Sequence, residues 1–377
     1  MFWYGLGSIA DAVPAIEKVL ALPKDVMRPA APAATPAVVV GQKQRKTERI
    51  FKVGLLGARG HTGIELLKLI EKHPFLRLEV ASSRSLKNRK ISEVIEGTTL
   101  DGTFQHLTPE EVEQHDKQVD LWFLAMPDKQ SQTYLEKIGR DTAVIDLSSD
   151  HRFDDSWVYG LPEMDDRQSI RTATRIANPG CYATASILSL LPLLRAEGDT
   201  VSETIVRGVP NIFGVSGYSG AGTTPNPRND VERLADNLLA YSLIGHTHER
   251  EVSRQLSQFG VAGNSDLAQG VRFMPHVAQF FRGIHLTVSV DLSGKLSRED
   301  LIYRYRTFYE DEPTIEILDA APEVKHIVGT PKVAIGAFAV SPDKKRLGTI
   351  LCYRERERER ELVTYARTRT NQHHVHI

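Results

Sequence analysis

The sequence has few of the features that mark several large classes of protein. It contains only two cysteines, Cys181 and Cys352, far apart and in unlike surroundings, which excludes a disulfide framework and a four-thiolate zinc site. Its 47 basic residues balance 48 acidic ones, so no basic field attracts nucleic acid or an anionic membrane. No apolar run approaches the roughly 20 residues that span a bilayer. We therefore expect a soluble chain of two domains whose partners are small molecules or protein.

The first 50 residues differ in texture from the rest. Residues 2–27 mix aromatic side chains with an apolar period that fits one short helix. Residues 28–50 turn to Pro and Ala and then to Lys and Arg, the composition of a disordered linker. Asp11 and Glu17 come early and no arginine precedes residue 28, so neither a secretory signal nor a transit peptide is predicted at this terminus.

Beyond this linker, short apolar runs alternate with helical periodicity. Residues 51–56 and 76–81 are predicted strands on either side of a helix over 62–72, and further apolar runs occupy 121–125 and 143–147. This alternation implies a parallel sheet with crossover helices.

The pattern changes after about residue 200. Residues 204–209 and 283–290 have the alternation of half-buried antiparallel strands, which indicates a second, α+β domain. Residues 354–361 are an unbroken Arg-Glu alternation that gives neither a helix nor a strand an apolar face, so we interpret them as a solvated tail.

A glycine-rich turn, G-x-x-G-x-x-G, follows the first predicted strand and opens the first predicted helix. Glycines let the backbone approach a pyrophosphate, and the helix N-terminus offers N–H groups to the anion. The spacing departs from the dinucleotide fingerprint G-x-G-x-x-G, and a purely structural turn is the alternative. The candidate cofactor-binding residues here are Gly57, Arg59, Gly60, His61, Thr62 and Gly63.

The end of the second predicted strand favours NADP over NAD. An NAD site usually has an acidic residue there for the ribose 2′-hydroxyl, whereas NADP requires donors for a 2′-phosphate. This chain has Ser82, Ser83 and Arg84, followed by further basic residues. A solvated basic loop is the alternative interpretation.

Cys181 is the candidate nucleophile. Pro179 and Gly180 precede it and the apolar stretch 185–194 follows, so the thiol is expected at a helix N-terminus, where the dipole favours the thiolate. An inert buried cysteine is the alternative.

His246 and His248 are the candidate acid/base partners of this thiol. Metal ligation by His-x-His is a rival interpretation, weakened because the sequence shows no further His or Cys cluster nearby. A third is a pair of surface histidines at a helix start. Residues 214–222 form a loop rich in glycine and hydroxyl groups that suits a phosphate or carboxylate, or serves only as a flexible connection.

Taken in order, these motifs resemble N-acetyl-gamma-glutamyl-phosphate reductase, particularly the fungal form made within an arginine-biosynthesis polyprotein. The related aspartate-semialdehyde dehydrogenases share the architecture but carry a different cysteine motif, which makes them the alternative enzyme. The resemblance covers residues 51–345 and rests on GARGHTG (57–63), DLSSDHRF (146–153), NPGCYAT (178–184), SGYSGAG (216–222) and GHTHERE (245–251).

The resemblance implies an α/β fold of the semialdehyde dehydrogenase type. A Rossmann-type NADP-binding domain would span 51–181 and an α+β substrate and dimerisation domain 182–331. Residues 332–350 would return to the NADP-binding domain. Homo-oligomers would form through the sheet of the second domain.

The resemblance also implies a reductive dephosphorylation. Cys181 would attack the acyl phosphate of N-acetyl-gamma-glutamyl phosphate, orthophosphate would leave, and NADPH would reduce the thioester to the semialdehyde. His246 matches the family's acid/base histidine. Residues at positions where the family holds substrate phosphate or carboxylate are Arg152, Asn178, Ser219, Gly220 and His248.

Both ends depart from the family pattern. After the strand that corresponds to residues 332–340, the family continues with a helix that lies near the nicotinamide, and this sequence has no counterpart to it. Residues 351–377 are interpreted as an atypical disordered tail of the kind that an aberrant gene model would produce. Residues 1–27 resemble the end of the acetylglutamate kinase half of the fungal polyprotein, so that kinase is a candidate partner. A mitochondrial location follows from the resemblance, with the cytoplasm as the alternative. The rival to an active enzyme is a non-catalytic remnant that only binds NADP.

Overall fold

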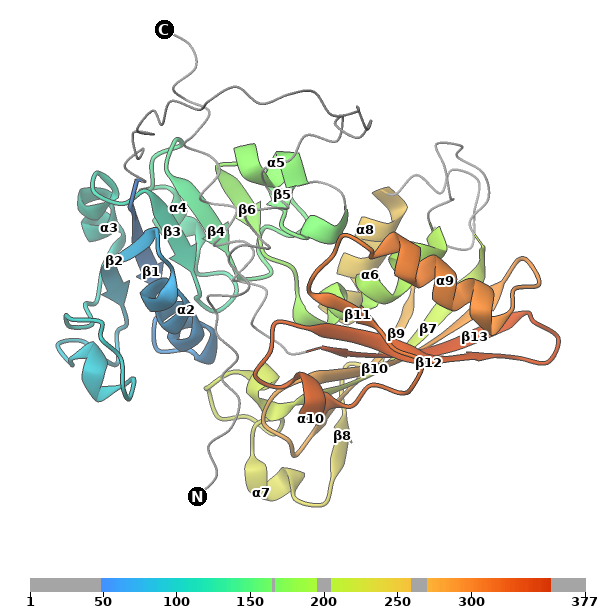
Figure 1. Cartoon of the computed structure of the whole chain (residues 1–377). Coiled ribbons are helices and arrows are strands. Elements are labelled where there is room, and N and C mark those ends of the chain that lie inside the picture. Colours follow the sequence, from blue (N-terminus) through green and yellow to red (C-terminus); the bar gives the residue numbers. More distant parts are fainter. Residues whose placement is uncertain (1–48, 165–166, 195–204, 259–269, 354–377) are drawn as a thin grey trace, which may run out of the picture. The chain divides into compact units, whose positions relative to one another are not determined.

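The computed structural model describes residues 49–164, 167–194, 205–258 and 270–353 (Figure 1). The chain divides into two units, Met1–Thr47 and Glu48–Ile377, and all described residues belong to the second. The helix predicted within residues 2–27, the linker and the Arg-Glu run lie outside the described residues. Within the described part, no helix has the length and apolar character needed to cross a bilayer.

The first sheet is parallel throughout, in the order β2-β1-β3-β4-β6-β5, which confirms the predicted α/β domain. Its central strands are short apolar runs buried on both faces, as in β3, where all four residues are buried. The elements are β1 (Phe51–Leu56), α2 (His61–Lys72), β2 (Leu76–Ser82), α3 (Pro109–Asp116), β3 (Leu121–Leu124), α4 (Gln132–Leu135), β4 (Ala143–Asp146), β5 (Val158–Tyr159), α5 (Arg167–Thr172) and β6 (Arg175–Ala177).

The second sheet is mixed, in the order β11-β12-β13-β10-β7-β9-β8. The predicted antiparallel pairing is confirmed for β7 and β10, whereas β7 and β9 are parallel. Strand β7 continues to Gly217, so the first part of the predicted loop 214–222 is strand. The elements are β7 (Val206–Gly217), α7 (Val231–Leu234), β8 (Leu238–Ala240), α8 (Thr247–Gln258), β9 (Arg272–Ala278), β10 (Ile284–Leu292), α9 (Arg298–Phe308), β11 (Ile315–Ile317), α10 (Val324–Ile327), β12 (Val333–Val340) and β13 (Arg346–Tyr353).

Helix α6 (Cys181–Leu194) is the centre of the second core. Every residue after Cys181 is buried, as expected for a helix that is apolar on all sides. It packs against β7, β10 and β13 and against helices α8 and α9, which lie with it on one face of the sheet (Figure 1).

The prediction for the C-terminal part of the chain is wrong. Residues 332–350 do not return to the first domain, because β12 and β13 pair with each other and β13 pairs with β10 in the second sheet. The proposed start of an atypical tail at residue 351 is also wrong. Leu351, Cys352 and Tyr353 are buried in β13, where they lie opposite Leu286, His285 and Ile284. With Ile350 they form an unbroken apolar run, which is the pattern of a buried strand and predicts the structure here better than the end of the family resemblance does.

Candidate active site

Cys181 is the first residue of α6, which confirms the predicted position at the start of a helix. The turn before it is held from two sides. The Asn178 N–H donates to the carbonyl of Asp146 at the end of β4 (2.8 Å), and the Gly180 N–H donates to Oε1 of Glu251 in α8 (2.8 Å). The nucleophile candidate therefore has a fixed backbone, and its side chain is partly exposed.

Gly180 is required by packing. A Cβ atom at this position would lie 2.4 Å from Nε2 of His248 and 2.7 Å from Nη1 of Arg152. The backbone before Cys181 thus touches both side chains directly, and any other residue would displace them.

Cys181 lines a cavity of about 380 Å³ with most of the predicted catalytic and substrate residues. Predicted residues that share this wall are Thr62, Arg152, Asn178, Gly220, His246 and His248. Ser219 does not line it. This residue is fully buried, and its N–H donates to the carbonyl of Phe281, so within the 3₁₀ turn Tyr218–Ala221 only Gly220 lines the cavity.

Arg152 and Glu251 form a buried ion pair at the back of the cavity. Nη1 of Arg152 donates to Oε2 of Glu251 (3.2 Å), Nε to the carbonyl of Asn178 (2.9 Å) and Nη2 to that of Leu147 (3.0 Å). The hydroxyl of Tyr159 donates to Oε1 of Glu251 (2.7 Å). Burial is the largest single influence on Arg152 and opposes its charge, but Glu251, Tyr159 and Cys181 together outweigh it and keep the arginine pKa above its ordinary value.

His246 and His248 lie side by side, with ring centroids 4.9 Å apart. The backbone N–H of His248 donates to Nδ1 of His246 (3.1 Å), so the neutral His246 ring carries its proton on Nε2. Burial, with a smaller contribution from Arg228, lowers the pKa of His246. Burial, followed by the charge of Arg152, lowers the pKa of His248 much further. Both rings are therefore neutral at pH 7.

The two rival interpretations of this histidine pair can now be compared with the structure. Both residues lie at the start of α8, as the third interpretation expects, but their rings line the cavity and not an open surface. Nδ1 of His248 is inaccessible and has no hydrogen-bond partner in the described chain. No group of three or more His, Cys, Asp or Glu side chains within the described ranges is arranged to hold a metal ion.

The motif DLSSDHRF is a structural support for Arg152. Oδ2 of the buried Asp146 accepts from the hydroxyl of Ser148 (2.7 Å) and lies 2.7 Å from Nδ1 of His151. The His151 ring stacks on Trp157, with 4.1 Å between the centroids. This network fixes the loop after β4, and the loop then carries Arg152 into the cavity.

The glycines of the predicted cofactor turn are required by backbone conformation and close packing. Gly57 has φ +87°, and a Cβ atom at Gly63 would lie 2.5 Å from the carbonyl oxygen of Gly57. No described side chain caps the start of α2, and no acidic residue lies in its first turn. No carboxylate in this first turn would repel an anion, and Thr62 in the same turn reaches the cavity of Cys181.

The other predicted cofactor residues lie around this turn. The carbonyl of Ser82 accepts from the N–H groups of Gly57 and Ala58, which ties the turn to the end of β2. The side-chain oxygens of Ser82 and Ser83 accept from backbone N–H groups of Leu107 and Leu86, and Arg84 is exposed beside them. Arg59 donates to Thr223 (3.5 Å), and the ring of His61 packs edge-on against Phe281 rather than in the cavity of Cys181.

Three residues of the site escaped the sequence analysis. Glu251 lies three residues after His248 on α8, and this helical spacing is a signal that would have identified it. Tyr159 and Arg228 come from short or irregular segments with no comparable periodicity.

Comparison with known proteins identifies both domains. Residues 52–173 match the NAD-binding domain of semialdehyde dehydrogenases, and residues 181–352 match their dimerisation domain. The structure resembles aspartate semialdehyde dehydrogenase from Francisella tularensis (TM-score 0.65, 16% identity, 84% of this chain and 99% of that one). It is similarly close to the Candida albicans enzyme with NADP (TM-score 0.64, 15% identity, 85% and 99%). These likenesses establish the fold.

Relatives found by sequence are more similar to this chain in sequence than these solved structures are. "N-acetyl-gamma-glutamyl-phosphate reductase" of Xanthomonas campestris is 45% identical, over 78% of this chain and 87% of the relative. "Protein arg-6, mitochondrial" of Neurospora crassa is 41% identical over 83% of this chain, and "Bifunctional protein argC, mitochondrial" of Dictyostelium discoideum 43% over 77%. The matched region spans about a third of these last two proteins, 34% and 33% of their lengths.

Proposed function

The chain belongs to the N-acetyl-gamma-glutamyl-phosphate reductase family, and from this we propose that it reduces N-acetyl-gamma-glutamyl phosphate to N-acetylglutamate semialdehyde with release of orthophosphate. This reaction is a step of arginine biosynthesis. One observation carries the proposal: a cysteine at the start of a helix shares a cavity with two neutral histidines and a buried arginine. That set suits an acyl phosphate, which needs a nucleophile, a proton donor and a cation.

The family uses a nicotinamide cofactor, and we assign NADP to this chain. The glycine turn before α2 packs closely on the protein's own backbone at Gly57 and Gly63, where a Cβ atom would meet Ala125 and the Gly57 carbonyl, and the start of α2 that follows has no described side-chain cap or acidic residue to compete with an anion. The residues that would hold the pyrophosphate are Gly57, Arg59, Gly60, His61, Thr62 and Gly63, and those nearest a 2′-phosphate are Ser82, Ser83 and Arg84. The bound cofactor would supply the hydride.

In the first half of the reaction, the thiolate of Cys181 attacks the acyl carbon. A carbon–sulfur bond forms, the bond from carbon to the phosphate oxygen breaks, and orthophosphate leaves. The Nε2–H of His246 is available to donate a hydrogen bond to the oxyanion formed at the carbonyl, because Nδ1 is occupied by the His248 N–H. Arg152 has three of its five N–H donors occupied, which leaves two for the substrate, and Asn178 and Gly220 lie beside it in the wall.

In the second half, hydride supplied by the bound cofactor to the thioester carbon would again place negative charge on that oxygen, where the Nε2–H of His246 can donate to it. Collapse then breaks the carbon–sulfur bond, gives the semialdehyde and restores the thiolate. Because the pKa of His248 is depressed most strongly, this ring stays neutral throughout and adds no charge to the cavity. His246 is the histidine that we assign to proton transfer, with His248 positioning it.

The reaction is tested in reverse with NADP, orthophosphate and N-acetylglutamate semialdehyde. We expect NADPH to form, and Cys181→Ser to abolish it. An unchanged rate in Cys181→Ser would rule out the thioester mechanism. Binding of NADP without turnover by the wild-type protein would support the remnant alternative, and turnover of aspartate semialdehyde instead would support the alternative enzyme.

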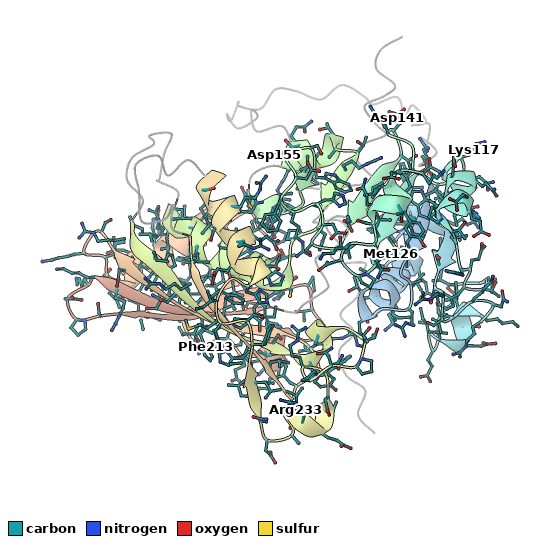
Figure 2. The ribbon with its side chains drawn as sticks, turned by 180° about the vertical axis from the view of Figure 1, so that it is seen from behind. Lys117, Met126, Asp141, Asp155, Phe213 and Arg233 are labelled. Atoms are coloured by element: carbon teal, nitrogen blue, oxygen red, sulfur yellow. The ribbon has the colours of Figure 1, made fainter. Side chains whose placement is uncertain are left out.

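The family's dimerisation domain makes a homo-oligomer the expected state. We place the interface on the face of the second sheet opposite α6. Phe213 of β7 is 36% exposed there (Figure 2), and its ring centroid lies 4.2 Å from that of His276 of β9 with the rings tilted by 35°. Its neighbour Ile212 is buried in the core around α6. From the mitochondrial relatives we further propose a mitochondrial location. From the resemblance of residues 1–27 to the end of the acetylglutamate kinase half, we propose that kinase as a partner.

A further inference from the structure

Arg228 is a second arginine in the wall of the Cys181 cavity. It is exposed, and no carboxylate within the described ranges forms an ion pair with it. Its guanidinium lies over the ring of Tyr241, with the carbon 4.8 Å from the ring centroid. Arg228 is therefore a cation in the wall of the cavity whose guanidinium N–H groups are available to a ligand.

Arg152 differs from Arg228 in both burial and hydrogen bonding. Its charge is neutralised by Glu251, and three of its N–H groups are held by protein oxygens. Among the described residues that line the cavity, Asp128 is the one carboxylate, and it accepts from the Ser149 N–H (2.9 Å). The positive charge of the cavity that no neighbouring carboxylate neutralises, and that an anionic substrate would therefore meet, is that of Arg228.

The loop that carries Arg228 is internally braced. Nδ2 of Asn226 donates to the carbonyls of Ala221 (3.2 Å) and Thr224 (2.8 Å), and Nδ2 of Asn229 donates to that of Gly222 (3.0 Å). The Arg228 N–H itself donates to Oδ1 of Asn226 (3.0 Å). These bonds and the Tyr241 ring hold the guanidinium in place before any ligand arrives, which reduces the entropy lost on binding.

We propose that Arg228 binds an oxyanion of the substrate in the Cys181 cavity, either its acyl phosphate or its carboxylate. This proposal rests on the proposed function and adds a residue to it. A guanidinium is suited to both groups because its planar N–H fork matches two oxygens at once. The lowered pKa of His246, to which Arg228 contributes after burial, agrees with a cation close to the acid/base histidine.

The two oxyanions separate in the reverse reaction, where orthophosphate and the semialdehyde are independent substrates. Loss of a hydrogen bond to a charged group corresponds to a change of about 10- to 100-fold. We expect Arg228→Met to raise the KM for orthophosphate by this factor if Arg228 holds the phosphate, and the KM for the semialdehyde if it holds the carboxylate. Arg228→Lys should raise the same KM by a smaller factor. The acidic limb of the pH profile of activity should move to higher pH in Arg228→Met, because the variant lacks the positive charge that helps to lower the pKa of His246.

Arg233→Met is the matched control, because Arg233 is an exposed arginine on α7 that faces a different cavity (Figure 2). It should leave both KM values unchanged. If wild-type protein turns over and Arg228→Met has wild-type KM values for both substrates, the proposal is overturned.

A binding measurement keeps the test independent of turnover. Calorimetric titration with orthophosphate and with N-acetylglutamate compares wild type with Arg228→Met even if neither is active. Weaker binding of either probe by the variant supports the assignment. Equal affinities, or no binding by either protein, overturn it without bearing on the reductase activity.

Discussion

Neutralising Glu251 should unfold the second domain at much lower temperature. The side chain is completely buried, and its carboxylate accepts from Arg152, Tyr159 and the Gly180 N–H. In Glu251→Gln the amide keeps the shape and an oxygen for Tyr159 and Gly180, but its NH₂ group would face the guanidinium of Arg152. A cation that is 8% exposed would then lack a counter-ion.

Removing one partner of a buried ion pair destabilises a protein by about 3–5 kcal/mol, because the remaining charge stays desolvated. In a domain of this size each kcal/mol lowers the melting temperature by about 2–4 °C. We therefore expect Glu251→Gln to melt about 6–20 °C below the wild type. The double variant Arg152→Met/Glu251→Gln should recover part of this loss, since it contains no unpaired charge.

Differential scanning calorimetry measures the effect, and Asp155→Asn is the control. Asp155 pairs with Arg254, one turn after Glu251 on the same helix, but its carboxylate is 87% exposed (Figure 2). Such a pair contributes about 0–1 kcal/mol. If Glu251→Gln melts within a degree or two of Asp155→Asn, Arg152 is solvated well enough to do without its partner, and our account of the site is wrong.

Three further predictions concern residues around the same cavity. Iodoacetamide should alkylate Cys181 and spare Cys352 in the folded protein, because Cys352 is inaccessible and burial raises its pKa to about 12. Mass spectrometry measures the modification of each cysteine, and equal rates at both would contradict the burial of β13. Gly180→Ala should reduce kcat strongly while the protein remains folded, because the new Cβ displaces His248 and Arg152. Steady-state kinetics measures kcat and circular dichroism checks the fold. A wild-type kcat would show that the two side chains make room for the Cβ atom without loss of function. The free energy of unfolding should fall as pH is lowered from 7 to 5. The unfolded chain binds a proton at His248 near its ordinary pKa of about 6.5, whereas the folded chain binds it only at much lower pH. Urea titrations should find this slope reduced in His248→Gln, and an equal slope in the variant would assign the effect to other groups.

The parallel sheet and the place of Cys181 were predictable because they depend on short-range signals. The strand over 51–56 and the helix over 62–72 have the apolar periods of buried elements, and β1 and α2 fall within a residue of them. The same logic placed the thiol at the start of α6, where a proline and a glycine precede an apolar run.

The site itself depended on contacts that no local pattern contains. Arg152 and Glu251 are 99 residues apart and meet only because α8 packs on α6. Arg228 enters the cavity from a loop whose shape is set by its own asparagine amides. The end of β13 is a different case, because its signal is local: the apolar run over residues 350–353 indicates a buried strand although the family resemblance does not extend to it.

The position of Cys181 on α6 links catalysis to folding. The helix that begins with the nucleophile is buried from its second residue to its last, so it cannot move without disrupting the core around it. Local opening elsewhere in the chain would leave the sulfur in place. Heat inactivation and global unfolding of the second domain should therefore occur as one transition, with no temperature range in which the protein is folded but its nucleophile is misplaced.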